Sequence, residues 1–282
     1  MNGLVFAAIA PHGGIVIEEA CPPDEREVAA NTRAGMEEMS RRFAAARPDV
    51  AVLLTPHNVH VTGSMAIIGA GSIAGSLTGA AQPVTLHGPI DRVLSYALRD
   101  AIVTGGIPVA EVSYGGNDAA SATMPMDWAT LVPYWFLGGR MSPPVPLVVL
   151  APARDLSAED HIQAGRIIAA AVRDSGKRVA LIASADNGHA HDANGPYGYS
   201  PNAKEYDLAV IKAVRENFLP QVRKIEPALV SGAKADSWWQ LLILSGALEG
   251  AAWEGTLLSY EAPTYFGMLC AAYTPTLVLE DQ

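Results

Sequence analysis

Short apolar runs alternate with longer segments in which apolar residues recur every three or four positions. The short runs hold few polar residues, which is typical of strands buried on both faces. They predict strands at Leu4–Ile9, Val50–Leu54, Met65–Ile68, Val109–Val112, Val145–Leu150, Val179–Ser184 and Thr256–Tyr260. The longer segments predict helices at Asp24–Ala46, Ile90–Thr104, Ser157–Ser175, Ala203–Asn217 and Ser237–Leu248.

The alternation of strands and helices predicts an α/β fold in three layers, with a mixed, largely parallel central sheet and helices on both faces. Two helices carry end signals. Asp24–Ala46 is acidic at its start and basic near its end, which suits the helix dipole, and Ser157 with Asp160 is close to a capping box.

No repeat or low-complexity linker divides the chain, and the Pro-rich segment Met141–Pro146 is as well explained by a turn into a strand. We expect a single catalytic domain, residues 1–282.

Composition narrows the class of protein. Half of the residues are hydrophobic and 17% are charged, enough apolar material for a large core. The net charge of −10 argues against a broad basic surface for nucleic acid. No apolar stretch reaches the roughly 18 residues of a membrane span, and the N-terminus resembles a first strand more than a signal peptide. Cys21 and Cys270 make no disulfide framework, so we expect a cytoplasmic protein.

Histidines cluster just beyond three of the predicted strands. His12 follows the first strand, His57 and His60 follow Val50–Leu54 in PHNVHV, and His189 and His191 follow Val179–Ser184. These five of the chain's seven histidines lie where ligands collect in an α/β sheet, at the carboxyl ends of strands. The pattern predicts a metal site.

The residue types restrict the metal without fixing it. Cysteine is absent from these loops, which excludes a thiolate zinc site. Two imidazoles and one carboxylate form the facial triad of non-haem Fe(II) oxygenases, and a further histidine could move protons near neutral pH. Zinc or manganese in a hydrolase would use the same ligands, so both reactions stay open.

Four segments together resemble the class III extradiol ring-cleavage dioxygenases, the LigB-like superfamily, which also contains Memo-like proteins. They are APHGG, VAVLLTPHNVHV, SADNGH and ADSWWQLLILSGAL, in the family's order and spacing. The resemblance implies a LigB-like fold, His12 and His57 as metal ligands, and His189 as the acid/base residue. It places Asp236 near the position of the carboxylate ligand.

Two departures from the family pattern concern the site. The family's carboxylate is usually Glu, whereas here it is Asp236, with Ser237 next to it and Glu261 as an alternative at another strand end. In PMDWATLVPYWF, Trp128 stands where the dioxygenases commonly have the histidine of D-H-G. The chain therefore resembles a branch apart from the protocatechuate enzymes.

Several neighbouring residues could shape a substrate pocket. We assign His60, Trp128, His191 and Tyr197 to this pocket. The family match favours His57 over His60 as the metal ligand and His189 over His191 as the acid/base residue, which leaves His60 and His191 as neighbours. The glycine-rich segment Ile67–Gly75 is not read as a dinucleotide site, since turn-forming residues rather than a helix follow it.

The resemblance implies an Fe(II) extradiol-type dioxygenase that cleaves a catecholic or aminophenolic ring with O₂. We expect an aromatic substrate, no nucleic acid or membrane partner, and a homodimer; some members of the family also work with a small partner subunit. Two alternatives remain: a Memo-like metal-binding or protein-interaction module, and a zinc-dependent hydrolase.

Overall fold

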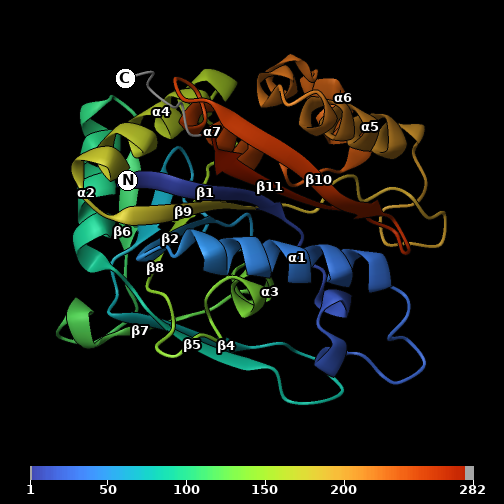
Figure 1. The fold of residues 1–282 in the computed structure, drawn as a ribbon, viewed down its shortest axis with the longest axis horizontal. Coiled ribbons are helices and arrows are strands. Elements are labelled where there is room, and N and C mark those ends of the chain that lie inside the picture. The colour runs from blue at the N-terminus through green and yellow to red at the C-terminus, as the bar shows by residue number, and fades with distance from the viewer. Residues whose placement is uncertain (1, 277–282) are drawn as a thin grey trace, which may run out of the picture.

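An eight-stranded sheet forms the centre of the computed structural model, which describes residues 2–276 (Figure 1). In spatial order its strands are β10 (Trp253–Glu261), β11 (Met268–Pro275), β1 (Gly3–Ala10), β9 (Arg178–Ser184), β2 (Val50–Leu54), β8 (Leu147–Ala151), β3 (Met65–Ile68) and β6 (Val109–Val112). The four central strands β1, β9, β2 and β8 are parallel to one another, as are β3 and β6. The remaining pairs are antiparallel, so the predicted mixed, largely parallel sheet is confirmed.

Helices cover both faces of this sheet, which confirms the three-layer prediction (Figure 1). One face packs against α2 (Arg92–Thr104), α4 (Ala158–Asp174), α5 (Pro201–Arg215), α6 (Pro227–Ala233) and α7 (Trp238–Ala247). The other packs against α1 (Ala30–Ala46), α3 (Trp128–Phe136) and a small sheet of β5 (Thr85–Pro89), β4 (Ser72–Ser76) and β7 (Thr123–Pro125).

Strand β1 shows why the central runs are apolar throughout. Ala7 and Ile9 point into the core under α4 and α7, whereas Phe6 and Ala8 point into the core under α1 and α3. Because successive side chains leave a strand on opposite faces, a strand covered on both sides needs apolar residues at every position.

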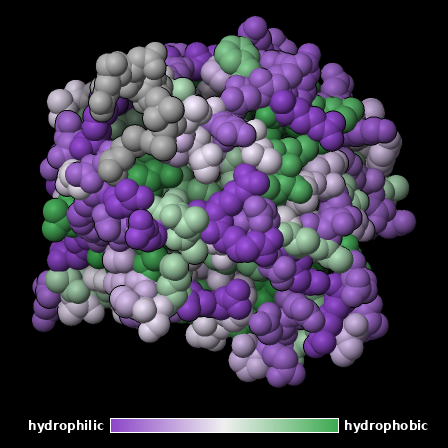
Figure 2. Space-filling view, viewed as in Figure 1, coloured by the Kyte–Doolittle hydropathy of each residue, from purple (hydrophilic) through white to green (hydrophobic). Residues whose placement is uncertain are grey.

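The outer surface is mostly polar. On the face seen in Figure 2, hydrophilic residues predominate and apolar residues lie in small patches among them. None of the helices within residues 2–276 combines the length and apolar character needed to cross a bilayer. Residue 1 and residues 277–282 of the expected domain lie outside the described residues.

Most elements that the sequence pattern missed are short, peripheral or unusual in composition, but one of them, β11, is an eight-residue strand of the central sheet. Strands β4, β5 and β7 form the small second sheet, and β4 and β7 offer little apolar pattern. Helix α3 contains Pro133, a residue that normally interrupts helices, and α6 spans only seven residues. The glycine-rich segment after β3 leads into β4 and not into a helix.

The predicted helix Asp24–Ala46 is wrong at its start. Turns occupy the residues after Pro22 and Pro23, and α1 begins only at Ala30. The acidic residues therefore lie outside its first turn, and the helix-dipole argument does not apply. At α4 the capping prediction is confirmed: Ser157 Oγ accepts from the Asp160 amide at 3.1 Å, and Asp160 accepts from the Ser157 amide at 3.0 Å.

Helices α4 and α7 touch backbone to backbone. A Cβ atom at Gly165 in α4 would lie 2.0 Å from the Ile243 carbonyl oxygen in α7, and one at Gly246 in α7 would lie 2.0 Å from the Ile162 carbonyl oxygen in α4. Only glycine allows this approach from either side. The crossing fixes the position of α7, and with it the segment that immediately precedes this helix.

We expect Gly165→Ala to lower the free energy of unfolding by about 1–3 kcal/mol, because the added methyl forces the two helices apart. Gly115→Ala is the matched control, since a Cβ atom at Gly115 meets nothing within 4 Å. Urea denaturation measures both. Equal stabilities of the two variants would contradict the close crossing.

Candidate metal centre

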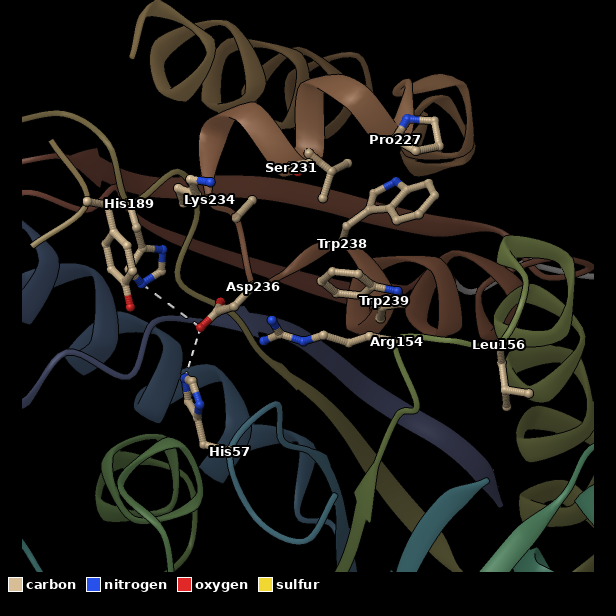
Figure 3. A pocket seen from close by; sticks show the side chains of 13 residues that line it. His57, Arg154, Leu156, His189, Pro227, Ser231, Lys234, Asp236, Trp238 and Trp239 are labelled. Atoms are coloured by element: carbon tan, nitrogen blue, oxygen red, sulfur yellow. Dashed lines mark hydrogen bonds and ion pairs between the residues drawn. The ribbon is translucent and has the colours of Figure 1, made fainter. Parts of the chain in front are cut away.

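Three strand ends meet at one edge of the sheet. Because β1, β9 and β2 are neighbours and parallel, their carboxyl ends lie side by side. His12 follows β1, His57 follows β2 and His189 follows β9. The segment before α7 adds Asp236, and in Figure 3 the side chains of His57 and His189 converge on its carboxylate.

His12, His57 and Asp236 lie together, with one ligand atom from each within 4.8 Å of the others. Asp236 Oδ2 is 2.9 Å from His57 Nε2 and 3.3 Å from His12 Nε2. The second carboxylate oxygen, Asp236 Oδ1, is buried without a hydrogen-bond partner among the described residues. Two imidazole nitrogens and a carboxylate with an unsatisfied oxygen suit a divalent transition-metal ion.

The tautomer of His12 follows from its neighbours. Ser184 Oγ lies 2.6 Å from the Ala129 carbonyl oxygen, which can only accept, so the hydroxyl donates its single proton there. Ser184 Oγ must then accept from His12 Nδ1 at 3.0 Å. In the neutral imidazole this leaves the lone pair on Nε2, the atom that faces Asp236, as a metal ligand requires.

Asp186 is a second carboxylate at His12. It accepts from the His12 backbone amide at 3.0 Å, and its Oδ2 lies 3.4 Å from His12 Nε2. Burial lowers the pKa of His12, but the charges of Asp186 and Asp236 outweigh it and raise this pKa to about 9. Burial alone would raise the pKa of Asp236, yet the neighbouring histidines, His12 foremost, bring it below its ordinary value.

His189 presents one free nitrogen to the same centre. Its Nδ1 lies 2.9 Å from the Asn187 carbonyl oxygen and therefore donates to it. In the neutral ring Nε2 keeps its lone pair, and this atom is 4.0 Å from Asp236 Oδ2. The ring stacks on Phe266 with a 5.6 Å centroid separation and meets Tyr197 edge-on. These contacts direct Nε2 of His189 toward the three candidate ligands.

Asp127 connects the His57 turn to α3. It caps the helix by accepting from the Thr130 amide, and it accepts from Thr55 Oγ1 and Asn58 Nδ2, both at 2.9 Å. The next residue, Trp128, stacks on the His57 ring with centroids 4.5 Å apart. Trp128 thus orients a candidate ligand where the family's dioxygenases commonly carry histidine.

Two cavities adjoin the centre. One of about 520 Å³ lies between Asp236 and helices α6 and α7, as Figure 3 shows, and the other, of about 630 Å³, lies on the side of His12. His57, His189 and Tyr197 line both cavities, and Trp128 lines the second. The predicted pocket residues Trp128 and Tyr197 are therefore at the site.

His60 and His191, which we also assigned to the pocket, line neither cavity. His60 is exposed. His191 Nε2 is 2.8 Å from Asp207 Oδ2, and the same buried carboxylate accepts from the Gly188 amide and the Tyr260 hydroxyl. His191 and Asp207 therefore order the loop that carries His189.

The two alternatives to Asp236 have other partners. Glu261 accepts from the amide and hydroxyl of Thr32 in α1, at 2.7 and 2.6 Å. Ser237 is buried, where its hydroxyl contacts Tyr206 and Asn187. Asp236 is the carboxylate that the structure brings to His12 and His57.

Sequence reasoning missed Asp186, Ser184 and Asp127. Asp186 could have been found by the rule that identified the histidines, since it follows β9 directly at the carboxyl edge. Ser184 and Asp127 gave no comparable signal, because their importance lies in contacts between segments distant in the sequence.

The chain belongs to the LigB family. The model of the catalytic LigB subunit of aromatic ring-opening dioxygenase matches residues 6–269. A Clostridium acetobutylicum protein, Protein CA_C1420, is 24% identical over 254 residues that make up 90% of this chain; the chain spans 54% of that relative's length. The crystal structure of uncharacterized protein JW3007 from Escherichia coli K12 shares the fold, with a TM-score of 0.61, 18% identity and coverage of 95% of this chain and 99% of that one.

We expect metal binding to strengthen as pH rises. A metal ion must displace the proton that His12 retains up to about pH 9 in the metal-free protein, so apparent affinity should rise by about tenfold per unit between pH 6.5 and 8.5. Competition with a chelator at fixed free metal measures this. Asp186→Asn keeps the oxygen that accepts from the His12 amide but removes a negative charge. The metal affinity of this variant should therefore stop rising at a lower pH than that of the unchanged protein. An unchanged pH profile would contradict the role of Asp186.

Proposed function

We propose that this chain is a non-haem Fe(II) dioxygenase of the extradiol type, which opens the ring of a catecholic or aminophenolic substrate with O₂. The observation that carries the proposal is the arrangement of His12, His57 and Asp236 around one point, with Nε2 of His189 directed toward it. Membership in the LigB family supports it. The homodimer, the small partner subunit and the single catalytic domain remain predictions.

His12, His57 and Asp236 would hold the iron. When bound, Fe(II) supplies open coordination positions for the two adjacent substrate heteroatoms and O₂, and it exchanges electrons between them. The hydrogen bond from His12 to Ser184 and the stacking of His57 on Trp128 keep both rings in place without the ion. Such orientation reduces the entropy lost on binding.

His189 would accept the proton of the substrate hydroxyl at Nε2 and return it as the ring opens. Its hydrogen bond to the Asn187 carbonyl keeps Nδ1 protonated, so that Nε2 is the basic atom. An imidazole suits both directions near neutral pH. The rings of Phe266, Tyr197 and Trp128 would wall the substrate and exclude water.

Metal content tests the ligand set. We expect the purified protein to take up one Fe(II) under anaerobic conditions, and His12→Ala to abolish this uptake. His87→Ala is the matched control, because His87 is an exposed residue of the small sheet. If His12→Ala retained its metal, the proposed site would be wrong. Zinc with ester or amide hydrolysis would favour the hydrolase, and absence of any metal would favour a Memo-like protein-interaction module.

The role of His189 predicts a specific kinetic defect. His189→Asn should bind Fe(II) normally but lower kcat for O₂ uptake with catechols and aminophenols by about 10²–10⁴-fold. His87→Asn should retain full activity. An oxygen electrode and ring-product absorbance measure the rates; an active His189→Asn enzyme would refute the acid/base assignment.

A further inference from the structure

Ser237 stands at the N-cap of α7 but does not cap this helix. A serine at this position normally accepts a hydrogen bond from an amide of the first turn, which stabilises the helix. Within residues 2–276 the Ser237 side chain makes no such bond, although it is fully buried. Departures from a local rule of this kind are typical of functional sites.

The Ser237 hydroxyl joins two other buried side chains instead. Its Oγ lies 2.9 Å from the Tyr206 hydroxyl in α5 and 3.2 Å from Oδ1 of Asn187. Because the amide oxygen can only accept, Ser237 donates its single proton to Asn187 and accepts from Tyr206. All three side chains are fully buried, so water does not compete for these two bonds.

Asn187 is the residue that orients His189. Its carbonyl oxygen accepts from Nδ1 of His189 at 2.9 Å, which leaves Nε2 as the basic atom of the ring. Its backbone amide donates to the Gly267 carbonyl at 2.8 Å. Because Ser237 holds its side chain and Gly267 holds its amide, Asn187 has little freedom to turn its carbonyl away from the His189 ring.

The segment that carries Asp236 therefore binds the loop of His189 at two points. Three residues before Asp236, the Ala233 carbonyl accepts from the His189 amide at 2.8 Å. One residue after Asp236, Ser237 donates to Asn187. These two bonds flank Asp236 along the chain, and they set the distance of 4.0 Å between His189 Nε2 and Asp236 Oδ2, which is drawn as a dashed line in Figure 3.

We infer that Ser237, supported by Tyr206, is a positioning residue that fixes the orientation of the His189 ring and its distance from Asp236. The inference rests on the proposed function, because His189 is taken to be the acid/base group. Ser237, Tyr206 and Asn187 line neither cavity at the metal centre, so Ser237 acts on the reaction through Asn187. A base that is misplaced by about 1 Å loses much of its effect, because proton transfer requires hydrogen-bond reach.

Nuclear magnetic resonance of the His189 ring tests the inference without turnover. In the metal-free protein, at a pH where the spectrum shows a neutral ring, the ¹⁵N shifts report which nitrogen carries the proton. We expect the proton on Nδ1 in the unchanged protein and a shift of the population toward Nε2 in Ser237→Ala. Ser245→Ala is the matched control and should leave the proton on Nδ1, because Ser245 is buried in the same helix with a hydroxyl that has no partner among the described residues. An unchanged His189 tautomer in Ser237→Ala would overturn the inference.

Oxygen uptake measures the kinetic consequence. Ser237→Ala should lower kcat by about 10- to 100-fold, with Fe(II) content and KM close to those of the unchanged protein. Tyr206→Phe should lower kcat less, because Ser237 can still donate to Asn187, and the double variant should be no slower than Ser237→Ala, because the two residues act in series. Tyr134→Phe is the matched control, since Tyr134 is equally buried and donates to the Val145 carbonyl but lines neither cavity. Additive losses in the double variant, or loss of metal with an unchanged kcat per bound Fe(II), would refute the positioning role.

The two measurements separate this inference from the proposed function. A tautomer shift in Ser237→Ala, without O₂ uptake by the unchanged protein on any catechol or aminophenol, would refute the dioxygenase proposal and leave the positioning of His189 by Ser237 in place. O₂ uptake by the unchanged protein, with an equal kcat in Ser237→Ala, would refute the positioning role alone. If Ser237→Ala did not fold, Tyr206→Phe would take its place in both measurements, and an unchanged tautomer with an unchanged kcat would then refute the inference.

Discussion

The parallel pairing of β1, β9 and β2 is the constraint on which the site depends. Parallel neighbours end at the same edge of a sheet, so residues separated by more than a hundred positions in the chain become adjacent there. This pairing alone brings His12, His57 and His189 to the same edge of the sheet. Had one of these strands run antiparallel, its histidine would lie at the opposite edge, and no loop of the observed length could return it.

The buried charges of Asp186, Asp236 and His12 are the second constraint on the site, beside the strand topology. Burying two carboxylates beside one imidazole is costly unless opposite charge compensates them. In the metal-free protein the proton of His12 supplies part of this compensation, since Asp186 and Asp236 hold its pKa at about 9. A divalent cation would supply more charge at the same place. The buried and unpartnered Asp236 Oδ1 adds to the demand for a cation.

The sequence predicted seven of the eight strands of the central sheet and helices on both of its faces, because an apolar run and a helical spacing are local patterns. The histidines were found because they follow strands, whereas Asp236 was indicated by the resemblance to the family alone. The wrongly predicted start of α1 shows the limit of such local patterns, because acidic residues that precede a helix look the same in the sequence as acidic residues in its first turn. No local sequence pattern indicated the contacts of Ser184 and Asp127. Their roles depend on which segments pack together, as does the separation of Glu261 and His191 from the site.

The first turn of α3 has a consequence for how the site is assembled. Three consecutive residues at this helix end contact the metal centre from one side. Asp127 binds the turn before His57, and Trp128 stacks on the His57 ring. The Ala129 carbonyl accepts from Ser184, which in turn orients His12. This helix end therefore acts as a template that sets the spacing between both imidazoles before any ion arrives. A rigid template of this kind selects among ions by their preferred bond lengths, and ion dehydration, more than ordering of the protein, would limit how fast the metal enters.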